Sequence, residues 1–99
     1  MSGKKGGQMR IMEDFAIAAF RSRQHALYFS QILKREGYET QLISTPKCIS
    51  IGCGLSLRFS PRNINQIIEI YRRNRVPIVG FYLIKQYGNT TQIKRISCD

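Results

Sequence analysis

The chain has 99 residues, enough for one domain, and 42% of them are apolar, enough for a modest core. Its 16 Lys and Arg against 6 Asp and Glu give a net charge of +10, which attracts nucleic acid, acidic proteins or anionic surfaces. The 3 cysteines are too few for a disulfide scaffold, and the longest apolar run, residues 15–20, is too short to span a membrane.

Residues 1–12 are rich in Gly and Lys and show no apolar period. They are expected to form a flexible basic tail, which carries Lys4, Lys5 and Arg10, ahead of a single domain over residues 13–99. The tail also lacks the apolar stretch of a secretory signal, so a cytoplasmic location is expected.

The first half of the domain contains three predicted elements. The run at residues 15–20 predicts a central strand that is covered on both faces or nearly so. Ser22 is a candidate N-cap, and apolar residues recur at helical spacing until Gly37, which predicts a helix over residues 22–36. Residues 38–44 predict a second strand because they include Thr and branched apolar residues.

The second half repeats this alternation. Residues 55–59 alternate apolar with polar and predict a third strand with one dry face. Ser60 and Pro61 are typical of a helix start, and apolar residues follow at helical spacing, which predicts a second helix. Residues 78–87 predict a fourth strand, and residues 92–96 a short fifth strand at an edge.

The order β-α-β-β-α-β predicts an α+β, ferredoxin-like fold, in which an antiparallel sheet carries both helices on one face. In that topology the connections at residues 21–22, 45–53 and 74–77 meet at one end of the sheet. The thiol of Cys53 would then lie among several basic side chains and the single histidine: Arg21, Arg23, His25, Lys47, Arg73 and Arg75.

Cys53 stands between Gly52 and Gly54, at the start of the third strand. Glycine permits positive φ and the close approach of another molecule, so this placement favours chemistry over packing. The pattern around it, Pro46, Lys47, Ile49, Ser50, Cys53 and Gly54, resembles the Putative Se/S carrier protein-like family, with a likeness over residues 14–84. The resemblance implies a protein that relays sulfur or selenium on Cys53 between donor and acceptor proteins, without a cofactor and without being a conventional enzyme.

Positive charge or a helix N-terminus near a thiol lowers its pKa and favours the reactive thiolate. Cys53 could then accept sulfur or selenium as a persulfide-type adduct, with Cys48 as a resolving thiol and His25 as a base. The alternative interpretation makes Cys53 a small apolar filler, Cys48 an incidental loop cysteine and His25 a packing or capping residue. Lys47 stands where the family usually has arginine, which loses the planar fork that grips an anion in two places.

Two further function classes remain open. The charge favours a nucleic-acid or ribosome-associated module that contacts phosphates through Lys4, Lys5, Arg10, Arg62 and Arg72. However, residues 55–59 lack the aromatic series of an RNA-binding strand, and a solvated helix face is the more common explanation of arginines like those of the second helix.

The fourth strand is apolar on both faces although helices would cover only one, which favours a homodimer or an adaptor that uses the open face. Residues 90–99 could cover that face instead.

Only Cys98 and His25 remain to complete a zinc site with Cys48 and Cys53, so no metal is expected. No paired carboxylates, phosphate-binding glycine loop or H-x-E metal motif occurs, which leaves hydrolase, kinase and metalloenzyme functions without support.

Overall fold

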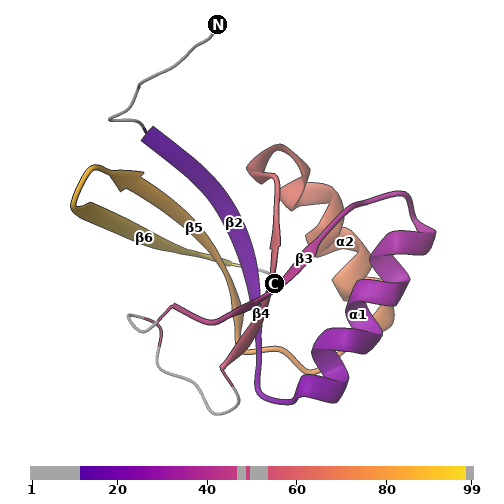
Figure 1. Cartoon of the computed structure of the whole chain (residues 1–99). Coiled ribbons are helices and arrows are strands. Elements are labelled where there is room, and N and C mark those ends of the chain that lie inside the picture. The colour runs from indigo at the N-terminus through magenta and orange to yellow at the C-terminus, as the bar shows by residue number, and fades with distance from the viewer. Residues whose placement is uncertain (1–11, 47–48, 50–53, 98–99) are drawn as a thin grey trace, which may run out of the picture.

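The computed structural model describes residues 12–46, 49 and 54–97, and it confirms an α+β protein with the predicted order of elements (Figure 1). The strands are β2 (Met12–Phe20), β3 (Gln41–Ser44), β4 (Leu55–Phe59), β5 (Gly80–Tyr87) and β6 (Thr90–Ile96). The helices are α1 (Arg23–Arg35) and α2 (Ile64–Asn74), and the single turn η1 (Pro61–Asn63) precedes α2. Within the described ranges, no helix is long and apolar enough to cross a membrane.

The strands form one antiparallel sheet in the order β3-β4-β2-β5-β6. The apolar strand β2 lies at its centre, as predicted, and its residues from Phe15 to Phe20 are all buried. β2 begins at Met12, earlier than the predicted strand, because Met12 pairs with Tyr87 at the far end of the long strand β5. Backbone pairing therefore continues beyond the apolar run from which the strand was predicted.

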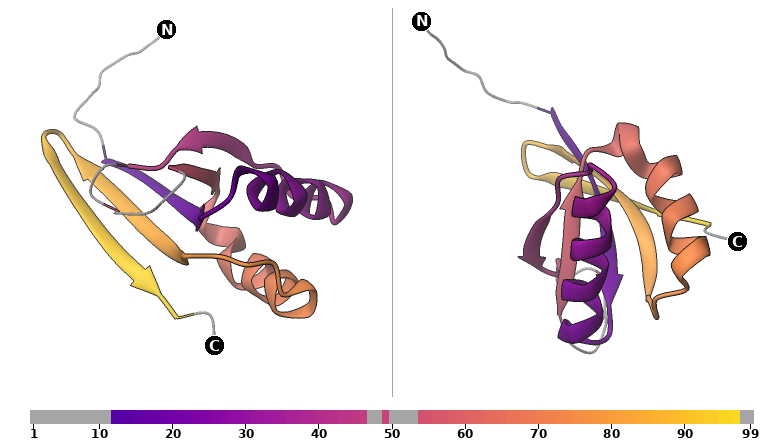
Figure 2. Two further views of the ribbon diagram at one scale, coloured as in Figure 1. Left: turned by 90° about the horizontal axis from the view of Figure 1, so that it is seen from below. Right: turned by 90° about the vertical axis from the view of Figure 1, so that its right-hand side faces the viewer.

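Both helices lie on the same side of the sheet (Figure 2). The sheet contributes residues that alternate along each strand, and Phe81 packs edge-on against Phe59 and Tyr71 with ring centroids 6.5 and 5.6 Å apart. The apolar period of each helix places one face on this core. The fully or almost fully buried members of the core are Ala16, Ala18, Phe20, Ala26, Phe29, Ile32, Leu33, Leu57, Phe59, Ile67, Ile68, Ile70, Val76 and Phe81.

The two helices end differently. α1 ends as predicted at Gly37, whose φ is +94°, and the Tyr38 N–H donates to the Leu33 carbonyl at 2.9 Å, as in a Schellman motif. This use of Tyr38 explains why β3 begins later than the predicted strand. α2 ends at Arg75, a non-glycine residue with φ +52°. The predicted cap Ser22 occupies the N-cap position of α1, but its hydroxyl makes no capping hydrogen bond with the described residues.

β6 continues the sheet as an edge strand beside β5, as predicted, although it starts at Thr90 rather than residue 92. Its residues from Thr90 to Arg95 are all exposed. The alternative in which residues 90–99 fold over the open face is therefore wrong for residues 90–96. Pairing with β5 satisfies the backbone of β6 and widens the sheet, and it leaves the helix-free face to be covered by another segment.

Candidate functional site

The two ends of the segment that carries Cys53 lie at the end of the sheet predicted from the topology. Leu55, just after this segment, pairs with Phe20 of β2 and with Ser44 of β3, and Gly80 of β5 pairs with Ala19. The turn before α1, the segment 45–54 and the link after α2 therefore meet at one end, as predicted from the topology. Cys48, Cys53 and Lys47 themselves lie outside the described residues.

The two ends of the segment 45–54 are joined by hydrogen bonds. The Thr45 N–H donates to the Gly54 carbonyl at 2.6 Å, and the hydroxyls of Thr45 and Ser56 lie 2.6 Å apart. Ser56 is fully buried, so this hydroxyl pair satisfies a polar group that would otherwise lose hydration without compensation. The base of the segment is thereby closed directly beside Cys53.

Gly54 has φ +74°, as its type permits. A Cβ placed there would meet no heavy atom of the described residues within 4 Å, apart from its chain neighbours. The backbone conformation therefore favours glycine at this position, and crowding does not. The open space beside Gly54 is compatible with the approach of another molecule, which was the second reason for expecting glycine next to the thiol.

Ile49 attaches the middle of the segment to the helix-free face of the sheet. Its side chain is 7% exposed and packs with Phe15, Ile17 and Ile84. Its N–H donates to the Pro46 carbonyl at 2.9 Å. The prediction that this apolar face lacks cover is therefore wrong at its centre, because Ile17 is fully buried there and Ile49 packs in the same cluster.

The predicted basic residues separate into two groups. Arg21 and Arg23 are exposed at the start of α1, directly after Phe20, so both lie at the end of the sheet where the segment 45–54 begins and ends. Arg75 is exposed at the C-cap of α2, two residues after Arg73. Arg73 instead forms an ion pair of 3.8 Å with Glu36 at the other end of α1. That end is roughly 20 Å along the helix from Arg23 at a rise of 1.5 Å per residue.

His25 lies in the first turn of α1, at the end of the sheet where Cys53 was predicted to lie, and is half-buried. Its Nδ1 is buried and has no hydrogen-bond partner among the described residues. A role as a base toward Cys53 would require this buried nitrogen to become exposed, because a proton cannot be taken from a thiol that the nitrogen does not reach.

The cations of the nucleic-acid alternative are also dispersed. Arg62 is exposed in η1, which follows the end of β4 farthest from the segment 45–54. Arg72 pairs with Glu69 at 3.2 Å on the same face of α2, an exposed pair of the kind common on helix surfaces. Lys4, Lys5 and Arg10 lie outside the described residues.

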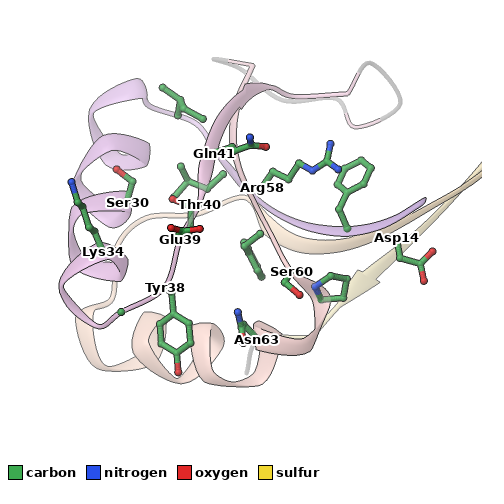
Figure 3. Close-up of a pocket in the computed structure, with 16 residues that line it drawn as sticks. Asp14, Ser30, Lys34, Tyr38, Glu39, Thr40, Gln41, Arg58, Ser60 and Asn63 are labelled. Atoms are coloured by element: carbon green, nitrogen blue, oxygen red, sulfur yellow. The ribbon is translucent and has the colours of Figure 1, made fainter. Parts of the chain in front are cut away.

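A groove that the sequence did not reveal lies at the opposite end of the sheet (Figure 3). It has a volume of about 1250 Å³ and runs between α1, the residues after it, and the ends of β4 and η1. Phe15 and Arg58 both line the groove, and the guanidinium carbon of Arg58 lies 4.1 Å from the ring centroid of Phe15. The charged side chains that line the groove are of both signs: Asp14, Lys34, Glu39 and Arg58. No local pattern indicates this groove, because separate segments meet only in the folded chain.

A group of three or more His, Cys, Asp or Glu side chains that could hold a metal ion does not occur within the described residues. This finding leaves Cys48, Cys53 and Cys98 aside, because all three lie outside those residues.

A model of one protein family, described as "Putative Se/S carrier protein-like", matches residues 15–83. The match begins in β2 and ends within β5, so it includes Cys53 and excludes β6. It confirms the resemblance that was identified from the residues around Cys53. Neither a curated protein nor a solved structure matches this chain.

Proposed function

This chain belongs to the Putative Se/S carrier protein-like family, and from that membership we propose that it carries sulfur or selenium on the thiol of Cys53. The observation that supports the proposal best is the attachment of the segment on both sides of Cys53. Ile49 is buried on the sheet four residues before it, and Gly54 is hydrogen bonded to Thr45 directly after it. The proposed position of the thiol, between these two points, is therefore at this end of the sheet.

The proposed chemistry is a thiol exchange. The Cys53 thiolate attacks the outer sulfur of a persulfide on the donor, a new S–S bond forms, and the S–S bond of the donor breaks. The electron pair of that bond leaves with the donor as a thiolate, and the proton stays on the transferred sulfur. An acceptor thiolate then removes the same sulfur by the same step. Selenium transfer follows the same scheme, with selenium in place of the outer sulfur.

Charge supports this scheme, because cations near a thiol favour its thiolate. Arg21 and Arg23 lie at the end of the sheet where the segment 45–54 begins and ends, and α1 begins there with the positive end of its dipole. We retain Lys47 as a further cation and His25 as a candidate base. In the proposed scheme Cys48 acts as the resolving thiol, which attacks the inner sulfur of the Cys53 adduct, forms a disulfide and releases hydrosulfide.

The proposal includes a ferredoxin-like arrangement for β2 to β5 and the two helices. Its support is the strand order β3-β4-β2-β5, the antiparallel pairing and the packing of both helices on one face. In this arrangement β6 is an addition at the edge beside β5.

The carrier function is tested by exposing the purified protein to a persulfide donor, digesting it, and locating the gain of one sulfur atom by mass spectrometry. The test uses a chain with Cys48→Ser, in which the proposed resolving thiol cannot remove the adduct, and we expect the added sulfur on Cys53. The gain should be lost when Cys53→Ser is added to this chain. Adding Cys98→Ser instead is the matched control, since it also removes one thiol, and it should keep the adduct. An equal gain with and without Cys53→Ser would refute the proposal.

Nucleic-acid binding is the second candidate, and the net charge of +10 is the observation that favours it. RNA and DNA fragments should then be retarded in a native gel at low salt, with an affinity that falls steeply as salt increases. A stable dimer or adaptor complex through the helix-free face is the third. It has less support than the sequence suggested, because Ile49 already buries the centre of that face.

A further inference from the structure

Arg95 of β6 lies against the backbone of Gly80 in β5. A Cβ built on Gly80 would be 3.0 Å from Nε and 3.3 Å from Nη2 of Arg95, and 3.3 Å from the Tyr82 ring. The Arg95 Nη2 donates a hydrogen bond of 2.9 Å to the Val79 carbonyl. Because Gly80 is not among the glycines with positive φ, the reason for glycine here is steric. The absence of a side chain at Gly80 leaves space for the guanidinium, and the hydrogen bond to Val79 holds the guanidinium there.

This position is on the helix-free face, on which Ile49 of the segment 45–54 also packs. Arg95 pairs with Tyr82, and Tyr82 packs against the cluster that includes Ile49. The guanidinium is directed toward Val79, whose N–H donates to Ala19 at the end of β2. Arg95 is thus directed toward the end of the sheet at which the thiol segment begins and ends.

The separation can be estimated from the strand pairing. Gly80 pairs with Ala19, and Ala19 pairs with Ser56, which holds the base of the segment through Thr45. Gly80, on which the Arg95 guanidinium packs, is therefore two strand spacings from Ser56, a separation of about 10 Å. A small molecule that reacts at the segment can reach both points.

The charge of Arg95 is not neutralised by another side chain. Within the part of the chain that the structure describes, Arg95 forms no ion pair, and its one hydrogen bond uses a backbone carbonyl. Most of its N–H donors remain available, and a guanidinium grips carboxylates and other oxyanions through two parallel hydrogen bonds. An anion is the ligand that such a group binds best.

We infer that Arg95 is a specificity-determining residue that binds the negative group of a small anionic sulfur or selenium donor at the thiol segment. The inference rests on the carrier function proposed for Cys53. β6 lies beyond the residues that match the family, so the selectivity is supplied by a strand outside the family match. No local sequence pattern indicates a role for Arg95, because its contact with Gly80 joins residues 15 positions apart.

The inference is tested with two disulfide reagents of different charge, on a chain in which Cys48→Ser and Cys98→Ser leave Cys53 as the single thiol. Dithiobis(nitrobenzoate) carries two carboxylates, and dithiodipyridine is uncharged. In both reactions the Cys53 thiolate attacks the disulfide, a mixed disulfide forms, and a coloured aromatic thiol or thiolate is released, whose absorbance gives the rate. The ratio of the two rates reports charge selectivity separately from thiol reactivity, which affects both.

We expect Arg95→Ala to lower the ratio of anionic to uncharged rates about two- to fivefold at low salt. Attraction between unit charges about 10 Å apart in water is worth roughly a factor of two for each reagent charge. Because salt screens such attraction, the effect should largely disappear at about 0.5 M salt. Arg95 is exposed, so its replacement should leave the fold intact.

Two further variants isolate the cause. Lys94→Ala removes the same charge from the next residue of β6, which faces the opposite side of the sheet, and the ratio should stay nearly unchanged. Gly80→Ala keeps every charge but displaces the guanidinium, so it should lower the ratio in the direction of Arg95→Ala.

The possible results separate this inference from the proposed function. If Cys53 does not react with the uncharged reagent, the carrier function fails, and the role of Arg95 fails with it. If Cys53 reacts but Arg95→Ala leaves the ratio unchanged, or lowers it no more than Lys94→Ala does, only the role of Arg95 is refuted.

Discussion

The side-chain oxygens of Thr45 and Ser56 lie 2.6 Å apart at the base of the segment that carries Cys53. Thr45 is also joined to Gly54 through its backbone N–H, so one residue closes the segment with two hydrogen bonds. Ser56 has no exposed surface, and water cannot replace this contact. The conformation of the segment is therefore coupled to the interior of the sheet.

Ser56→Ala should destabilise the protein by about 1–2 kcal/mol, because it leaves the hydroxyl of Thr45 without its partner. Urea unfolding followed by circular dichroism measures the change. Ser60→Ala is the matched control, since Ser60 is exposed and its hydroxyl caps no helix within the described chain, and its effect should stay within about 0.5 kcal/mol. Equal effects of the two variants would show that the hydroxyl pair does not form.

Ile49→Ala should cost about 2–3 kcal/mol, near the lower end for buried isoleucine, because a surface segment can partly refill the space. The same unfolding measurement applies. Leu27→Ala is the control, because Leu27 is also a large aliphatic residue but is 41% exposed on α1, and it should cost well under half as much. If both variants have the same small effect, Ile49 does not attach the segment to the sheet in solution.

Ile49→Ala should also increase local opening of the segment 45–54 that carries Cys53. Amide hydrogen exchange of the segment 45–54 should increase in Ile49→Ala at denaturant concentrations where the helices stay protected. Local opening of this kind is expected when the apolar contacts of a surface segment are removed. Exchange that increases uniformly over the whole chain would indicate global destabilisation instead.

Local sequence patterns predicted the order of elements because each depends on neighbouring residues. The apolar run of β2 and the helical spacing ahead of Gly37 are examples, and both elements formed close to the expected positions. The element ends were less accurate, because they depend on partners. Tyr38 is drawn into the close of α1, and Met12 is held in the sheet by Tyr87.

The candidate site was less predictable for the same reason. The end of the sheet at which the segment 45–54 begins and ends followed from topology alone. The packing of Ile49 on Ile17 and the pairing of Arg73 with Glu36 join residues more than 30 positions apart, and no spacing rule relates them. The contact of Arg95 with Gly80 also cannot be predicted from local sequence, because a glycine in a strand does not indicate which side chain packs against it.

Gly54→Ala should destabilise the protein by about 1–2 kcal/mol, since an L-residue is strained at φ +74° even though the space around its Cβ is open. Unfolding in urea gives the value. Gly54→Asn should lose less, because asparagine tolerates the left-handed region better than alanine does. If alanine and asparagine were equally unfavourable, the cause would be steric and not conformational.

Arg75→Gly should stabilise the protein by about 0.5–1 kcal/mol, because Arg75 ends α2 at φ +52°, where glycine carries no Cβ penalty. The gain is smaller than the full left-handed penalty because glycine also loses more chain entropy on folding. Arg75→Ala is the control: it removes the same charge but keeps the Cβ, so it should show no comparable gain. A similar stabilisation by alanine would instead assign the gain to relief of repulsion within a chain of net charge +10, and the conformational explanation would then be wrong.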